Sequence, residues 1–450
     1  MRYDRILPVL LPVLCLALSA VLLAEDAANN PPITWDESAT AESLGLEPLT
    51  LPEDFYLVYP WDQVDVTSWS NHYKGDPAKS FARMAQSAFS VPAFVTQEDI
   101  PAAKEAGFHC LLVSMGTGDI DLINGTEEEV DAFVKQRVAG TKDDPDVLGY
   151  YIIDEPGAKK FPVLGMFVAA VKKYAPGKLA YINLFPSYAS TIGADVDSQM
   201  QTYTFTEYLE RYVQEVKPQF ISYDNYMVEY SEDLTDKGRA AIYWRDLLEV
   251  RRVAQKYGLP WWNIVSSMAI RKNSSPPNMS RMALQAYTSL AAGANALGWF
   301  LFFGLTYGPT DQQDENTLTW QIQRDVNEQT VTLGKILNRF RSTNVWFSEP
   351  TGNLPGNPGD LLRGVNLSYQ EEIKDKVGTP SVMVGEFRAK AAAQKAVMLV
   401  NLDVGRSITA SLDLKEAGTI QVVNPVTGTA HAPRQREWIL PGHGLLFLID

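Results

Sequence analysis

Short apolar segments alternate with longer amphipathic ones from Phe55 to about Asn344. The short segments are rich in β-branched and aromatic residues, which is typical of buried strands, and the long ones carry apolar residues at helical spacing. Eight segments are therefore predicted to be strands: Phe55–Trp61, Ser90–Thr96, Phe108–Met115, Val147–Ile153, Leu179–Phe185, Gln219–Tyr226, Trp261–Met268 and Ala296–Phe303. Helices are predicted at Lys159–Tyr174, Thr206–Val216, Ala240–Tyr257, Met282–Gly293 and Ile322–Phe340.

This alternation indicates the α/β class. Eight strand–helix repeats over this length predict a (β/α)8 TIM barrel, which we expect to span residues 51–345. The alternative is a doubly wound open sheet. It is weakened because no Gly-x-Gly-x-x-Gly motif follows the first predicted strand.

The pattern changes after about Trp346. Helical spacing disappears, and turns rich in Gly, Pro and Asn separate short alternating segments, which are Ser381–Phe387, Ala396–Asn401, Ser407–Leu412, Thr419–Val423 and Gly444–Ile449. Such a pattern predicts a small C-terminal antiparallel β-sandwich domain over residues 346–450. The Gly- and Pro-rich stretch at 349–359 is the expected linker.

The N-terminus has the features of a secretory signal peptide, expected at residues 1–24 and followed by a leader segment at 25–50. Arg2 and Arg5 precede an apolar run from Ile6 to Leu23, and Ala24 is a suitable cleavage point. An uncleaved membrane anchor is the alternative. With cleavage, we expect a secreted or periplasmic protein without stable membrane insertion.

Composition and motifs exclude several classes of site and partner. Four scattered histidines and two cysteines, of which only Cys110 lies after the signal, do not form a zinc-site pattern, so no metal or other cofactor is expected. No Gly-x-Ser-x-Gly motif suggests a serine hydrolase. A net charge of −15 argues against nucleic acid as a partner. The oligomeric state stays open.

The most informative chemistry lies where the predicted strand Val147–Ile153 ends, at Asp154-Glu155-Pro156. Pro156 cannot continue a ladder, so both carboxylates are expected at the C-terminal end of a parallel strand, where α/β barrels build active sites. A Glu partly buried among aromatic residues has a raised pKa and can donate a proton at neutral pH. An acidic N-cap of the next helix is the alternative interpretation.

Other strand ends add a second carboxylate and possible sugar contacts. Glu155 and Asp224 lie on the fourth and sixth predicted strands, so we expect them to converge over the barrel axis, as the two carboxyls of glycoside hydrolysis must. Glu155 is the candidate general acid and Asp224 the second catalytic group, with Glu229 and Asp154 as substitutes. The candidate sugar platforms, each with core packing as the alternative, are Trp61, Trp261, Trp262 and Trp299. The other candidate substrate-binding residues are Asp154, Asn183, Tyr223, Asn225, Tyr226, Glu229 and Asn263.

A family resemblance rests on these motifs. Gly149-Tyr-Tyr-Ile-Ile-Asp-Glu-Pro-Gly157 is similar to the Asn-Glu-Pro-type fourth strand of the glycoside hydrolases of clan A, in which the acid/base Glu ends that strand. The segments 181–186, 221–226 and 284–294 resemble exported bacterial relatives of the family 42 type, in which a β-domain follows the barrel. The resemblance implies a glycosidase acting on an oligosaccharide or polysaccharide, with Glu155 as its acid/base residue.

Two positions depart from that clan. Asp154 stands where the clan usually has Asn, and the seventh predicted strand, Trp261–Met268, has no Glu where the clan places its nucleophile. The clan's retaining mechanism therefore does not carry over unchanged. Either another carboxylate takes the second role, or the chain is a non-catalytic carbohydrate-binding protein on a glycosidase-like barrel.

Overall fold

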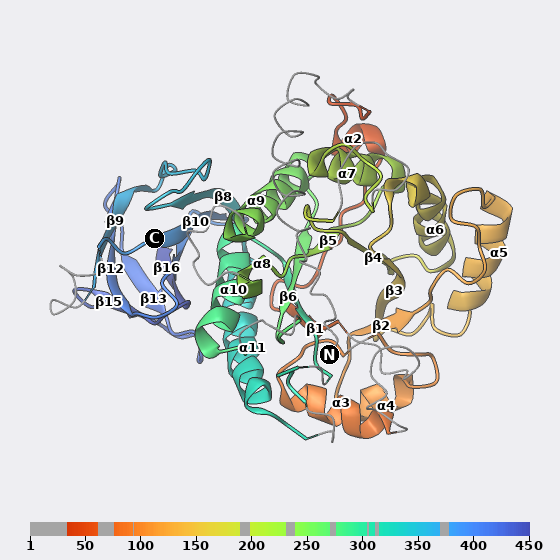
Figure 1. Cartoon of the computed structure of the whole chain (residues 1–450), viewed down its shortest axis with the longest axis horizontal. Coiled ribbons are helices and arrows are strands. Elements are labelled where there is room, and N and C mark those ends of the chain that lie inside the picture. Colours follow the sequence, from red (N-terminus) through yellow and green to blue (C-terminus); the bar gives the residue numbers. More distant parts are fainter. Residues whose placement is uncertain are drawn as a thin grey trace, which may run out of the picture.

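The computed structural model describes residues 34–61, 76–92, 94–189, 199–230, 239–270, 276–303, 306–310, 315–369 and 378–450, without the side chains of 229, 230, 239 and 240. The predicted signal peptide lies outside these residues. An α/β barrel and a β-rich unit lie side by side (Figure 1). Among the described residues, no helix is both long enough and apolar enough to cross a membrane.

In the described residues, seven parallel strands form the barrel sheet, in the order β1-β7-β6-β5-β4-β3-β2. They are β1 (Leu57–Pro60), β2 (Leu111–Ser114), β3 (Val147–Asp154), β4 (Leu179–Leu184), β5 (Ile221–Asp224), β6 (Trp261–Ser266) and β7 (Ala296–Phe300). Every one of them falls on a predicted strand to within a few residues, because buried parallel strands leave a near-continuous apolar run in the sequence.

The remaining predicted strand, Ser90–Thr96, is not a regular strand in its described residues, which form isolated bridges. Val95 pairs in parallel with Val113 of β2, and the N–H groups of Ser90 and Val91 donate to the Val58 carbonyl of β1. The segment therefore closes the ring between the two edge strands. Pro92 lies in its middle and has no N–H for a regular ladder, which explains why the expected full strand does not form.

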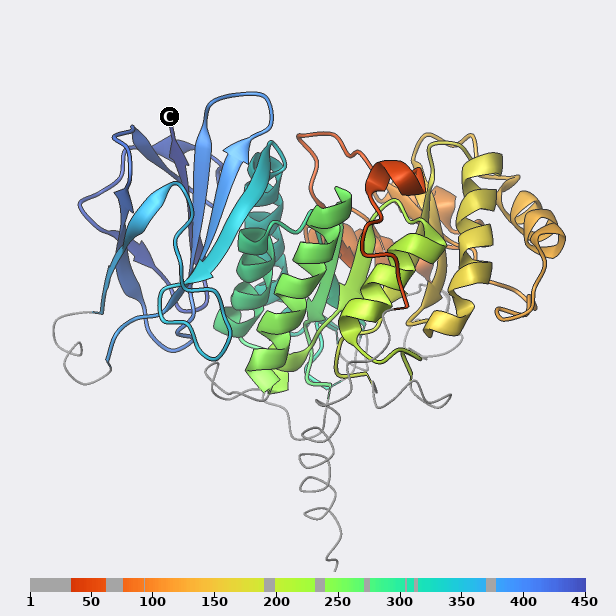
Figure 2. The ribbon, with the colours of Figure 1, turned by 90° about the horizontal axis from the view of Figure 1, so that it is seen from above.

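Helices surround the barrel (Figure 2). They are α2 (Ala41–Leu44), α3 (Pro77–Gln86), α4 (Ile100–Glu105), α5 (Glu127–Val138), η2 (Ala158–Lys160), α6 (Phe161–Tyr174), α7 (Phe205–Arg211), η3 (Tyr212–Val216), α8 (Met227–Tyr230), α9 (Arg239–Tyr257), α10 (Met279–Ala292) and α11 (Leu318–Leu337). Caps set several ends: Thr126 and Glu129 form a capping box on α5, and Gly293 ends α10 at a φ of 87°. The helix predicted at Ile322–Phe340 is displaced, because α11 begins at Leu318 and Phe340 already belongs to a strand.

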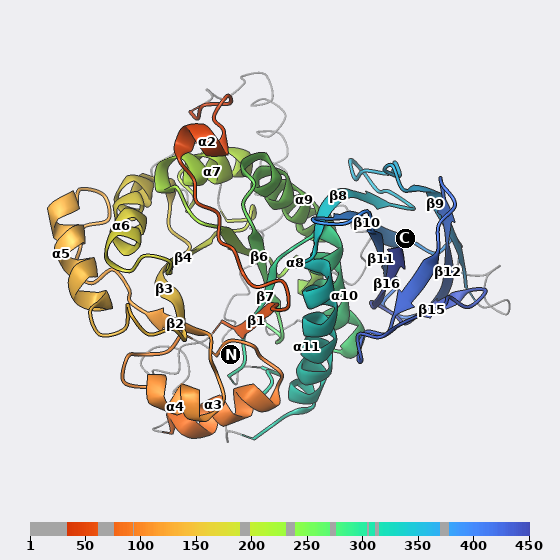
Figure 3. The same cartoon turned by 180° about the vertical axis from the view of Figure 1, so that it is seen from behind.

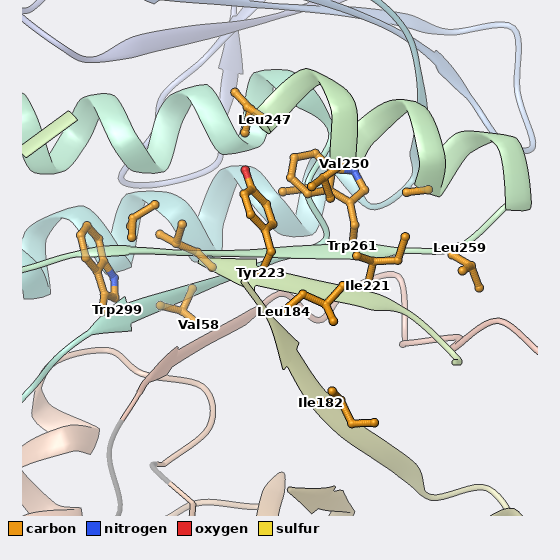
Figure 4. Close-up of a cluster of buried hydrophobic side chains, with 14 of the residues drawn as sticks. Val58, Ile182, Leu184, Ile221, Tyr223, Leu247, Val250, Leu259, Trp261 and Trp299 are labelled. Carbon is orange, nitrogen blue, oxygen red and sulfur yellow. The ribbon is translucent and has the colours of Figure 1, made fainter. Parts of the chain in front are cut away.

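Side chains from the strands form two separate cores. Those pointing inward fill the barrel with an aromatic cluster that includes Tyr59, Tyr181, Phe220 and Trp262. Those pointing outward pack against the helices, as Figure 4 shows for one part of this second core. The segment before β1 crosses one end of the barrel (Figure 3), and its Leu49 packs against the inner cluster. That end is thus covered, which leaves the C-terminal strand ends for a site.

The second unit consists of two antiparallel sheets. Its strands are β8 (Phe340–Phe347), β9 (Leu362–Ser368), β10 (Val382–Ala389), β11 (Lys395–Asn401), β12 (Ile408–Leu414), β13 (Ile420–Val423), β14 (Ala430–His431), β15 (Glu437–Ile439) and β16 (Gly444–Ile449). They pair in the orders β14-β13-β16-β11-β10-β8 and β15-β12-β9. Residues of both sheets share one apolar core. The predicted fold class, a TIM barrel followed by a β-sandwich, is confirmed.

The sandwich packs directly on the barrel helix α10. Gly385 of β10 lies so close to this helix that a Cβ on it would come within 2.1 Å of the Ala291 carbonyl oxygen. A glycine is required at this position for the two backbones to approach each other. The two units therefore share a close-packed interface.

Candidate active site at the barrel mouth

Three carboxyl groups meet at the C-terminal strand ends, which we call the mouth. Asp154 ends β3, Glu155 follows it, and Asp224 ends β5. The Glu155 and Asp224 carboxyl groups lie close enough for each to shift the pKa of the other. Asn183 of β4, the strand between them, donates from Nδ2 to Asp154 Oδ1 at 3.1 Å and to Asp224 Oδ1 at 3.0 Å. The side chains of β3 and β5 therefore converge over the barrel.

The backbone at Glu155 is unusual. Its φ is 44°, in the left-handed region that residues other than glycine rarely adopt. Its N–H donates to the Asn183 carbonyl at 2.9 Å, and Pro156 follows. Such conformations cost of order 1–3 kcal/mol and are concentrated at functional sites, where the surrounding structure holds them. Here the turn directs the Glu155 side chain toward Asp224.

The setting raises the proton affinity of all three groups. Burial, followed by the charge of Asp154, raises the pKa of Glu155 to about 7. Asp154 reaches water on one side, but the protein around it removes enough solvent to raise its pKa to about 6. Burial and then the charges of Glu155 and Asp154 raise the pKa of Asp224 well above its usual value.

These groups have no compensating positive charge in the described part of the chain. No Lys or Arg is among the main causes of their pKa shifts, and no cluster of three or more His, Cys, Asp and Glu side chains could hold a metal ion in the described residues. The carboxyls therefore reduce their mutual repulsion by retaining protons. At neutral pH the cluster can both donate a proton and present a carboxylate.

Aromatic side chains form walls beside the carboxyls. The half-buried Trp61 packs edge-on against Phe94 and Tyr151, with ring centroids at 4.8 and 5.5 Å. On the side of β5, the ring centroids of Tyr226 and Phe300 lie 5.2 Å apart, and Tyr226 is close enough to Asp224 to lower the pKa of that carboxyl. Of the expected contact residues, Trp61 and Tyr226 thus lie at the mouth, next to the carboxyl cluster.

Three other expected contact residues point away from the mouth. Tyr223 is fully buried and points toward Leu247 and Val250 of α9 (Figure 4). Asn225 is fully buried and donates to Asp246 of α9 at 2.8 Å, and Asn263 is fully buried and donates to Ser289 of α10 at 2.9 Å. The expectation that these three bind substrate is corrected, because strand alternation sends them into the helix layer.

Three of the four expected tryptophan platforms are also corrected. Trp261 and Trp299 belong to the core between strands and helices, and the Trp299 ring N–H donates to Asn327 of α11 at 2.7 Å. Trp262 fills the barrel interior, with its ring 4.0 Å from that of Phe220. These side chains are only 0–3% exposed, so none can offer a face to a sugar.

The remaining candidate contact residues are Asn183 and Glu229. Asn183 is 2% exposed, and both of its N–H bonds are directed at carboxyl groups rather than at the opening. Glu229 belongs to α8, and its side chain lies outside the described part of the chain. The sequence reasoning missed Tyr151 and Ser222, which share the inward face with Trp61 and Asp224. The period-two alternation of each strand was the available signal.

Comparisons with known proteins support the architecture. No family model and no curated protein matches this sequence. A solved glycoside hydrolase of family 5 from Bacteroides vulgatus aligns over 92% of this chain and 95% of its own, with a TM-score of 0.50 and 11% identity. Another solved structure, described as a glycoside hydrolase, aligns over 92% and 98%, with a TM-score of 0.50 and 10% identity. At this identity the likeness shows a glycosidase-like fold.

Proposed function

We propose that this chain is an exported glycoside hydrolase, related to the family 42 type, with Glu155 and Asp224 as its catalytic carboxyls. The observation that carries the proposal is the convergence of these strand ends at the mouth, where Asn183 Nδ2 donates both to Asp224 and to Asp154, the residue before Glu155. Glycoside hydrolysis needs two carboxyls on one sugar, one of them protonated and the other ionised. Two neighbouring carboxyls with raised pKa values supply that state near neutral pH.

The proximity of the two carboxyls favours a retaining mechanism. Inverting enzymes keep their carboxyls about 6.5–9.5 Å apart to admit a water, whereas retaining pairs lie about 5–5.5 Å apart. Two carboxyls close enough to shift each other's pKa suit the shorter of these separations. In our proposal Glu155 protonates the leaving oxygen while Asp224 attacks the anomeric carbon, and Glu155 then activates the water that releases the sugar.

The substrate we propose is a neutral oligosaccharide or polysaccharide. The mouth holds three carboxyls, and the net charge of −15 disfavours anionic ligands. The aromatic walls at Trp61 and at Tyr226–Phe300 suit the apolar faces of a sugar ring. These rings and the two carboxyls lie at the same end of the barrel, where a bound glycosidic bond could reach the carboxyls.

A second candidate is a carbohydrate-binding protein without catalysis. It is favoured by β6, whose six residues, Trp261–Ser266, contain no carboxylate where clan A hydrolases place their nucleophile. In that case the same mouth would bind glycan and leave it uncleaved. Turnover separates the two candidates directly.

The test is a hydrolysis assay of the purified protein on aryl glycosides and oligosaccharides, repeated with Glu155→Gln. The substitution keeps the side-chain shape and removes the acid, so hydrolysis of unactivated glycosides should fall by about 10²–10⁴-fold. Substrates with a good leaving group need no protonation and should be much less affected in the first step.

Glu127→Gln, at an exposed position in the first turn of α5, is the matched control and should leave turnover unchanged. Glycan binding without hydrolysis by the wild-type protein would favour the second candidate. Hydrolysis of natural glycans by Glu155→Gln at the wild-type rate would rule out Glu155 as the acid.

A further inference from the structure

A chain of hydrogen bonds leads from the barrel interior to the carboxyl cluster. The hydroxyls of Tyr59 and Tyr181 lie 2.5 Å apart, and Tyr181 lies 3.0 Å from Ser222 Oγ. Ser222 Oγ is 2.9 Å from Asn183 Oδ1, and Asn183 Nδ2 reaches Asp154 and Asp224. All four linking side chains are 0–2% exposed, so bulk water does not compete for these bonds.

The chemistry of each group sets the direction of the chain. Asn183 Oδ1 can only accept, so Ser222 must donate its single hydrogen to it. Ser222 then has no hydrogen left for Tyr181, so Tyr181 donates to Ser222. By the same reasoning Tyr59 donates to Tyr181. Every hydrogen therefore points toward the mouth.

The chain also determines the orientation of the Asn183 amide. With Ser222 donating to Oδ1, the two N–H bonds of Nδ2 face Asp154 and Asp224. A flipped amide would place its oxygen against both carboxyl groups, which is electrostatically unfavourable. The amide thus fixes two acidic side chains of different strands relative to each other.

The barrel leaves space for this chain at one glycine. A Cβ on Gly298 of β7 would lie 2.8 Å from Tyr59 Cζ and 2.9 Å from its hydroxyl oxygen. Any side chain larger than hydrogen would therefore displace the ring that begins the chain. The packing of β1 and β7 and the hydrogen bonds at the mouth are linked through this contact.

We propose that Tyr59, Tyr181, Ser222 and Asn183 act as positioning residues, a one-way chain of donors that orients Asp154 and Asp224 and stabilises their ionised forms. The inference deepens the proposed function, because it assigns the groups that keep Asp224 available as a carboxylate. Donors directed at a carboxylate favour its charged form, and linked hydrogen bonds polarise one another.

The test is a pH titration by NMR of protein labelled with ¹³C at the aspartate carboxyl carbons, with the two signals assigned from Asp154→Asn and Asp224→Asn. Ser222→Ala should raise the proton affinity of at least one of the two carboxyls about three- to tenfold, the equivalent of one lost hydrogen bond. Tyr181→Phe should raise it less, and Tyr59→Phe least, because each removes a donor farther from the carboxyls.

Tyr56→Phe is the matched control. Tyr56 is equally buried, but its hydroxyl donates to the Ala294 carbonyl outside the chain, so both titrations should stay unchanged. Unchanged titrations in all three chain variants, with wild-type melting temperatures, would overturn the proposal, as would an equal change in Tyr56→Phe. Each chain variant removes a single hydroxyl, so the loss of one variant to misfolding leaves two.

The titration does not depend on turnover, so it separates this proposal from the proposed function. Shifted titrations in a protein that cleaves no glycoside would support the donor chain and reject the hydrolase. A working hydrolase with unshifted titrations would do the reverse. In an active enzyme, the same variants should lower kcat more than they change KM, with the acidic limb of the pH profile moved to higher pH.

Discussion

Glu210 in the helix layer and Asp224 at the mouth are buried carboxyls with opposite surroundings. In the helix layer, Glu210 is 2% exposed and accepts from Lys256 at 2.9 Å, Tyr257 at 2.7 Å and Arg252 at 3.4 Å. At the mouth, Asp224 is similarly buried, at 3% exposed, but its neighbours include two further carboxyls. The buried Glu210 is thus surrounded by opposite charge, whereas the buried Asp224 is surrounded by like charge.

This difference separates a structural role from a functional one. A carboxyl that serves stability is compensated within the fold, since an uncompensated buried charge is strongly destabilising. A carboxyl that must act on a ligand is left without full charge compensation until the ligand binds. The first expectation is therefore that substitutions at the mouth reduce activity, whereas those in the helix layer reduce stability.

The largest expected effect is that of Asp224→Asn on turnover. The substitution is nearly isosteric and removes the second catalytic charge, so hydrolysis should fall by about 10²–10⁴-fold. Stability should rise, by roughly 0.5–2 kcal/mol, because a repulsive contact disappears. Kinetics on one glycoside and urea unfolding at neutral pH measure both effects. Retained turnover would mean that another group, with Glu229 as the first candidate, is the second carboxyl.

Alanine substitutions at Trp299 and at Trp61 should have effects almost as large as that of Asp224→Asn, and different from each other. Trp299→Ala removes a ring that is fully buried in the helix layer and should cost about 3–5 kcal/mol of unfolding free energy. Trp61→Ala, at the half-buried position of the mouth, should weaken glycan affinity about tenfold with a smaller loss of stability. Thermal melts and a binding isotherm test the pair. A large stability loss at Trp61 with unchanged affinity would assign that ring to the core.

A smaller effect is expected for Glu210→Gln. The variant weakens charge-assisted hydrogen bonds to Lys256, Arg252 and Tyr257, and should lower the unfolding free energy by about 1–3 kcal/mol. Turnover per folded molecule should stay at the wild-type level, because this group lies outside the mouth. Impaired kcat in the folded variant would show that the two regions are coupled.

The smallest effect concerns pH. The charge of Asp154 raises the pKa of Glu155, so Asp154→Asn should lower it and move the alkaline limb of kcat/KM from near pH 7 to lower pH. A several-fold change in proton affinity, about 3–10-fold, is the expected size. A limb that stays in place would show that the group titrating there is not Glu155.

The same pKa values predict how stability depends on pH. Raised values, about 6 for Asp154 and about 7 for Glu155, mean that the folded state binds more protons than the unfolded state between about pH 4 and 7. The contribution of these groups to stability is complete at low pH and decreases as pH rises through the folded-state values. Asp154→Asn and Glu155→Gln should each flatten this dependence in urea melts.

The sequence by itself was sufficient for the elements of this protein and for the position of its acidic strand ends. Strand β3 matches the predicted Val147–Ile153 with one added residue, and α9 matches the predicted Ala240–Tyr257 equally well. Hydrophobic period and turn residues are local properties, so they can be read along the chain. The same reasoning placed Glu155 and Asp224 at the strand ends and inferred that they converge.

Only the tertiary structure decided what each side chain does there. Asn183, Ser222 and Tyr181 come from neighbouring strands, and their donor chain depends on the register that pairs Asn183 with Ser222. The inward or outward direction of Tyr223 and Asn263 and the burial of three tryptophans depend on barrel closure in the same way. Hydrogen bonds, burial and the pKa values that follow from them arise between residues far apart in the chain, and no local pattern encodes them.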